Sequence, residues 1–141
     1  MSSKQLFKKW IHEKNLDEKL KAELKDLAGD SQKLEDAFYA PLEFGTSGMR
    51  GILGPGINRM NIYTVRQATE GLARFMDEQD SETKGREIAI AYDCRHMSPE
   101  FAMEAAKTLD NHNIPSYVFE SLRPTPELAF VVRYRKRLLK L

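Results

Sequence analysis

The sequence predicts an α/β fold: a mixed, mostly parallel sheet flanked by helices, preceded by a helical N-terminal extension. Two short apolar runs, residues 87–93 and 115–119, are rich in β-forming residues and predict strands. A helix signal of about a dozen residues separates them. Strand, helix and strand in this order imply parallel pairing with a right-handed crossover. Residues 1–40, by contrast, show helical spacing of apolar residues and no strand signal.

Residues 1–40 are expected to form a helical extension, and residues 41–141 a partial α/β domain. Candidate N-caps precede the second and third helices of the extension: Asn15 or Asp17, and Asp30 or Ser31. Pro41 ends the third helix. Trp10 lies on an apolar helix face, which favours a packing anchor over a stacking platform for a ligand.

The α/β part begins with an extended, glycine-rich segment and continues with a helix over residues 62–78, for which Asn61 is the expected N-cap. Ser98, followed by Pro99, is expected to cap the helix between the two strands. A last helix is expected to start near Thr125, with Leu138 among the candidates for its packing face.

Composition excludes several classes of protein. Apolar residues make up 41% and charged residues 30% of the chain, and the formal net charge is +1. This balance gives no global field for nucleic acid or a membrane, and no apolar run reaches the roughly 20 residues of a spanning helix. The single cysteine, Cys94, excludes an internal disulfide and is expected to be buried. We expect a soluble, cytoplasmic protein without a secretory signal.

Residues 42–51 (LEFGTSGMRG) are the stretch whose residue types converge on one chemistry. Glycines allow a sharp turn and close approach to a ligand, and the Thr46 and Ser47 hydroxyls lie beside them in sequence. Arg50 offers a planar fork of donors that suits a phosphate or carboxylate. An oxyanion cradle and a plain tight turn with a surface arginine both fit these residues. A P-loop and a hydrolase elbow do not, because their glycine spacing is absent.

Four segments together resemble the α-D-phosphohexomutases, the family of the bacterial phosphoglucomutases and phosphomannomutases. They are FGTSGMRG at 44–51, NRMN at 58–61, YDCR at 92–95 with Ser98, and RPTPEL at 123–128. Members of this family are built of four domains around one cleft. They move a phosphoryl group between two oxygens of a hexose phosphate through a phosphoserine, using magnesium and glucose 1,6-bisphosphate.

The resemblance implies roles for individual residues. Thr46, Ser47 and Arg50 would line the phosphoserine site, with Arg50 stabilising charge on the transferring phosphoryl group. Asp93 and Arg95 would form a structural pair at the end of the central strand. The motifs T-A-S-H-N-P, D-G-D-x-D-R and G-E-x-S-G are absent, so the nucleophilic serine, the metal ligands and the sugar-selecting residues are missing.

We therefore interpret the chain as a truncated N-terminal part of the first domain, without catalytic or metal-binding residues of its own and inactive alone. Truncation in the gene, with a frameshifted basic end, and a deliberately expressed piece are both open. The missing last strand is expected to leave a sheet edge through which the chain self-associates. Two alternatives remain: a stand-alone phosphosugar- or phosphate-binding module, and an interaction fragment that uses the edge or the basic tail. Glucose, mannose and pentose phosphates are not distinguished by these residues.

Overall fold

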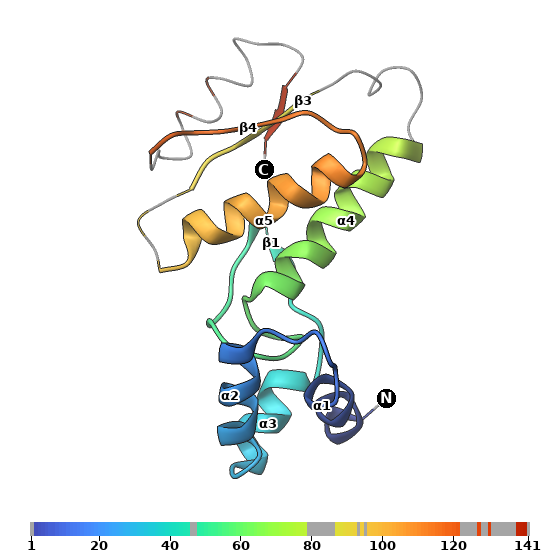
Figure 1. The fold of residues 1–141 in the computed structure, drawn as a ribbon, viewed down its shortest axis with the longest axis vertical. Coiled ribbons are helices and arrows are strands. Elements are labelled where there is room, and N and C mark those ends of the chain that lie inside the picture. The colour runs from blue at the N-terminus through green and yellow to red at the C-terminus, as the bar shows by residue number, and fades with distance from the viewer. Residues whose placement is uncertain are drawn as a thin grey trace. The chain divides into compact units, whose positions relative to one another are not determined.

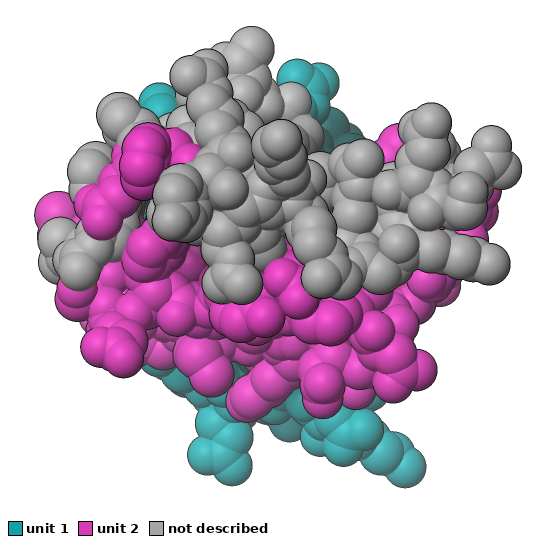
Figure 2. Space-filling view, turned by 90° about the horizontal axis from the view of Figure 1, so that it is seen from above, with its two compact units in different colours: residues 1–64 teal, residues 65–141 magenta. Residues whose placement is uncertain are grey.

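The computed structural model of the chain describes residues 2–45, 48–78, 87–92, 94, 96–121, 127, 130 and 138–140. The chain divides into two compact units, residues 1–64 and residues 65–141, coloured teal and magenta in Figure 2. The predicted division into residues 1–40 and 41–141 stays a prediction. Among the described residues, no helix is both long enough and apolar enough to cross a bilayer.

The first unit contains three short helices, which confirms the helical nature of the N-terminal extension (Figure 1). They are α1 (Ser3–Ile11), α2 (Glu18–Leu27) and α3 (Ser31–Phe38). Each begins with a side-chain cap, because Ser2, Asp17 and Asp30 accept hydrogen bonds from backbone N–H groups of the first turn. The predicted alternatives Asn15 and Ser31 are therefore not the caps.

Phe38 is the centre of the core of the first unit, with 1% of its surface exposed. The rings of Phe7 and Trp10 meet it edge to face, with centroids 6.1 and 5.6 Å away. Trp10 also meets Tyr63 at 5.7 Å. The prediction of Trp10 as a packing anchor is confirmed.

The second unit is built on a parallel sheet with the strand order β4-β3-β5. Its strands are β3 (Glu87–Ile90), β4 (Ser116–Val118) and β5 (Leu138–Lys140). Ile88 is in register with Ser116, and Glu87 with Leu138. Helix α5 (Ser98–Asn111) connects β3 to β4, and it lies beside α4 (Ile62–Glu78) on one face of the sheet (Figure 1). The predicted α/β class and parallel strand–helix–strand unit are confirmed.

Several local predictions need correction or stay untested. Leu138 belongs to a strand that pairs with β3, and not to the packing face of a helix. Ser98 is the first residue of α5, and the N-cap is Met97, whose φ of 68° turns the chain into the helix without a side-chain cap. Cys94 is exposed rather than buried. The helix expected from Thr125 falls largely, and the Asp93–Arg95 pair wholly, outside the described residues.

Candidate functional site: a glycine-rich hairpin followed by Arg50

The glycine-rich segment forms a short antiparallel hairpin in the first unit. Strand β1 (Phe44–Gly45) pairs with β2 (Gly48–Met49), so that Phe44 is opposite Met49 and Gly45 is opposite Gly48. Residues 46–47 connect the strands and lie outside the described residues. The hairpin therefore places the predicted phosphate-binding residues at a connection and at a strand end.

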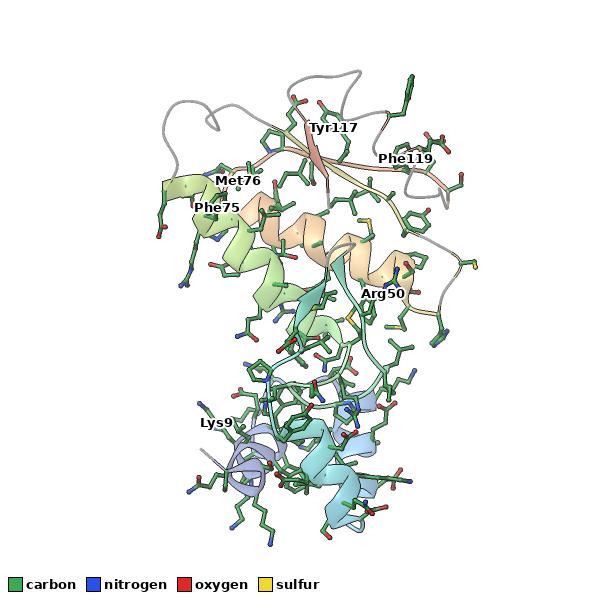
Figure 3. The ribbon with its side chains drawn as sticks, turned by 180° about the vertical axis from the view of Figure 1, so that it is seen from behind. Lys9, Arg50, Phe75, Met76, Tyr117 and Phe119 are labelled. Atoms are coloured by element: carbon green, nitrogen blue, oxygen red, sulfur yellow. The ribbon has the colours of Figure 1, made fainter. Side chains whose placement is uncertain are left out.

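Arg50 follows β2 directly and is exposed (Figure 3). Among the described residues it has no acidic partner for an ion pair. Thr46 and Ser47, the other two predicted site residues, fall on the connection that the structure does not describe. Their grouping with Arg50 around a phosphate stays a prediction.

The residues on either side of the hairpin, Leu42 before it and Ile52 after it, are both hydrogen-bonded to one neighbouring segment, residues 53–60. Before β1, the backbone N–H of Leu42 donates to the carbonyl of Ile57 at 2.9 Å. After Arg50, the carbonyl of Ile52 accepts from the N–H of Met60 at 2.8 Å. Two backbone hydrogen bonds thus join the residues that flank the hairpin to one loop, which we call the supporting loop (residues 53–60).

Gly51 lets the two ends of the hairpin approach each other. A Cβ atom at this position would lie 2.8 Å from Cδ1 of Leu42, closer than real Cβ contacts allow. The side chain of Leu42 therefore packs against the backbone directly after Arg50. A side chain at this position would make the flexible end of Leu42 shift, so the packing favours glycine modestly.

Asn61 joins the supporting loop to the start of α4. Its Oδ1 accepts hydrogen bonds at 3.0 Å from the N–H groups of Tyr63 and Thr64, which confirms the predicted N-cap. Its Nδ2 donates to the carbonyls of Gly54 and Gly56 at 2.9 and 3.0 Å. The buried Asn61 side chain therefore caps a helix and closes a loop at once.

Arg59 joins the same loop to the C-terminal end of α3. Its guanidinium pairs with the carboxylate of Asp36 and donates to the Asp36 carbonyl at 3.3 Å. Only 13% of the Arg59 side chain is exposed, against 59% for Asp36. Sequence reasoning placed Arg59 in the NRMN motif but assigned it no role, because its partner lies in the N-terminal extension.

A second polar cluster lies in the other unit, between α4 and α5. The imidazole of His112 lies 2.9 Å from Oε1 of Glu70 and 3.0 Å from Oδ2 of Asp77. The hydrogen bond to Glu70, followed by that to Asp77, raises the pKa of His112, and the hydrogen bond from His112 lowers the pKa of Glu70. Arg66 and Glu104 make a further ion pair between the two helices. These contacts were not predicted, since the partners are far apart in sequence.

The fold and this site define an α/β domain of the strand–helix–strand type that carries a glycine-rich hairpin followed by an arginine. The profile of the family described as phosphoglucomutase/phosphomannomutase, alpha/beta/alpha domain I, matches residues 41–139. The chain belongs to this family, which confirms the resemblance inferred from the motifs.

Relatives are known from bacteria and mammals. The chain is 40% identical over 114 residues to a phosphopentomutase of Homo sapiens, covering 77% of this chain and 19% of the human protein. It is 40% identical over 124 residues to a phosphoglucomutase of Staphylococcus aureus strain RF122, covering 88% of this chain and 21% of that protein. The chain therefore spans about a fifth of the length of these relatives. No solved structure gives a significant match.

The family generally uses a magnesium ion, and two observations bear on whether the described part of this chain could hold one. The D-G-D-x-D-R loop is absent from the sequence. In the part of the chain that the structure describes, no group of three or more His, Cys, Asp or Glu side chains is placed to hold a metal ion.

Proposed function

We propose that the chain serves as the phosphate-binding N-terminal part of a phosphohexomutase, with Arg50 contacting a phosphoryl group of a sugar phosphate. The observation that carries this proposal is the position of Arg50. It is exposed and directly follows a hairpin whose flanking residues, Leu42 and Ile52, are hydrogen-bonded to the supporting loop. An arginine in such a place offers a fixed fork of donors to an incoming anion.

Phosphoryl transfer asks little covalent chemistry of the protein and depends mainly on positioning and charge stabilisation. Arg50 supplies positive charge, and the backbone N–H groups of the glycine-rich segment supply further donors. Thr46 and Ser47 complete the proposed phosphate site through their hydroxyls. The remaining chemistry, including the nucleophile, the magnesium ion and glucose 1,6-bisphosphate, belongs to parts of the family that this sequence does not contain.

The names of the relatives support a sugar phosphate as the substrate class. They include phosphoglucomutases and phosphopentomutases, so both hexose and pentose phosphates are candidates. The phosphate group is common to all of them, and it is the part that Arg50 recognises in this proposal. The choice among sugars would then fall to residues outside this chain.

The test is a titration of the ¹⁵N-labelled chain with glucose 1-phosphate, and with inorganic phosphate in parallel. We expect saturable shifts of the amide signals of Gly45, Gly48 and Gly51 and of the Nε–H signal of Arg50. The variant Arg50→Ala should lose about tenfold or more in affinity, the usual scale of a charge-assisted contact. Arg74→Ala, which removes an exposed arginine of α4, should bind as the unchanged chain does. Equal affinity of Arg50→Ala and the unchanged chain would overturn the proposal.

A further inference from the structure

We infer that Arg59 and Asp36 are positioning residues for Arg50: their ion pair fixes the supporting loop on α3, and the loop binds the residues on either side of the hairpin. This inference rests on the proposed function, since it explains how Arg50 is held for a phosphate. It also gives the N-terminal helices a role in the site, which neither the motifs nor the names of the relatives assign.

Arg59 and its neighbour Asn58 contact the C-terminal end of α3. The last carbonyl groups of a helix have no partner within the helix. Here the carbonyl of Asp36 accepts from the side chains of Asn58 and Arg59 at 3.1 and 3.3 Å, and the carbonyl of Ala37 accepts from the N–H of Asn58 at 2.9 Å. A cation at this end of the helix also complements its dipole. Two consecutive residues of the loop thus bind the open end of α3.

The Arg59 guanidinium is also bonded to the supporting loop itself. Arg59 also donates to the carbonyl of Asn58 at 3.1 Å, which links the guanidinium to the loop backbone as well as to α3. Asn58 and Arg59 lie between Ile57 and Met60, the two loop residues that bind the segments before and after the hairpin. A shift of the loop away from α3 therefore displaces both hydrogen bonds that join the loop to the residues on either side of the hairpin.

The orientation of Arg50 determines how well it binds a phosphate in this proposal. A planar guanidinium makes several contacts at once only from one orientation, so a small displacement of its backbone weakens all of them. Removing the Arg59 side chain should leave the core around Phe38 in place, because that core is formed by apolar side chains packed on one another. We expect a folded variant with phosphate affinity reduced about threefold to tenfold.

The experiment measures the phosphate and glucose 1-phosphate affinities of the 141-residue chain by the titration described above. The variants are Arg59→Ala, Arg59→Lys and Asp36→Asn. Lysine keeps the positive charge but lacks the planar fork of donors that contacts the carboxylate and two carbonyls together. The phosphate affinity of Arg59→Lys should therefore fall between those of Arg59→Ala and the unchanged chain. The matched control is Lys33→Ala, which removes an exposed ion pair with Asp30 on the same helix without touching the loop.

A second arm separates positioning from general structural damage. In an Arg50→Lys background, whose affinity is lowered but measurable, Arg59→Ala should cause little further loss if Arg59 acts through Arg50. An equal loss in both backgrounds would overturn the inference. If Arg59→Ala does not fold, the loss of phosphate affinity in the two backgrounds is compared for Arg59→Lys and Asp36→Asn instead. If Arg50→Ala weakens phosphate binding but no variant of Arg59 or Asp36 does, this inference alone is overturned. If Arg50→Ala has no effect on phosphate binding, the proposed function is overturned.

Discussion

The Nε2 atom of His112 lies 2.9 Å from Oε1 of Glu70, so an ionisable pair joins the end of α5 to α4. The other ring nitrogen lies 3.0 Å from a carboxylate oxygen of Asp77. A neutral imidazole has only one N–H to donate, and only the protonated ring can donate to both carboxylates. The packing of α4 against α5 is therefore linked to the protonation of His112.

This link predicts a pH dependence of stability. Because the pKa of His112 is raised in the folded chain, its contribution is fully present below about pH 6.5, the unfolded value, and is lost as pH rises through the higher folded pKa. The pKa of Glu70 is lowered, so its part is present above pH 4.5 and is lost as pH falls through its lowered folded value. The His112–Glu70 pair thus stabilises the fold most strongly between about pH 4.5 and about pH 6.5.

Urea unfolding at about pH 6 and about pH 8 tests the prediction. The midpoint of the unchanged chain should fall on going to the higher pH, and His112→Gln should show a smaller fall. The control is His96→Gln, which replaces an exposed histidine of the same unit. Identical pH dependence of the unchanged chain and His112→Gln would show that the pair does not contribute.

Gly56 is expected to tolerate no side chain. Its φ is 123°, and a Cβ atom would lie 2.5 Å from the carbonyl oxygen of Ala37. Gly56→Ala should lower the free energy of unfolding by about 2–4 kcal/mol, because strain and a backbone clash add. Gly71→Ala is the matched control: this position in α4 has open space around a Cβ, and alanine should stabilise the helix by about 0.5–1 kcal/mol. Equal effects of the two changes in chemical denaturation would contradict the geometry of the loop.

The two roles of Asn61 can be separated by substitution. Asn61→Asp keeps the acceptor that caps α4 but removes the donor to Gly54 and Gly56, and Asn61→Ala removes both. We expect losses of about 1–3 kcal/mol for the aspartate and a larger loss for the alanine variant, measured by thermal or urea unfolding. Asn111→Ala, at an exposed helix end, should change stability by less than about 0.5 kcal/mol. A harmless Asn61→Asp would mean that the two loop carbonyls do not depend on this donor.

Phe38 should carry much of the stability of the N-terminal helices. Phe38→Ala removes a side chain that is 1% exposed and that meets two aromatic rings, and it should cost about 3–5 kcal/mol. Phe75→Ala provides the control, because that ring is 55% exposed and its loss should cost little. Unfolding followed by circular dichroism measures both. If Phe38→Ala lowers the free energy of unfolding as little as Phe75→Ala does, Phe38 is not the centre of the core of the N-terminal helices.

The sequence predicts those features that depend on neighbouring residues. The spacing of apolar residues locates the helices, and Asn61 is recognisable as a cap because its partners are the next residues along the chain. The parallel pairing of β3 and β4 follows from the helix between them. The glycines of residues 42–51 likewise predict an extended segment with a sharp turn, which the structure shows as the β1–β2 hairpin. The anion-binding role of Arg50 stays a prediction.

Contacts between distant residues could not be predicted in the same way. Arg59 forms an ion pair with Asp36 of the N-terminal extension, and His112 pairs with Glu70 of another helix. No pattern in the sequence indicates either pairing. Strand β5 was missed because Leu138–Lys140 is a short segment next to a basic run, where a helix end was the simpler interpretation. Its pairing with β3 comes from tertiary contacts rather than from local preference.

The most direct test of the central claim is a phosphoglucomutase assay on a chimera. In it, the segment of the Staphylococcus aureus phosphoglucomutase that matches this chain is replaced by the matching residues of this chain. We predict conversion of glucose 1-phosphate to glucose 6-phosphate by the chimera, and a loss of at least about a hundredfold in kcat/KM on Arg50→Ala. A folded chimera without activity, or one whose activity does not depend on Arg50, would contradict the account.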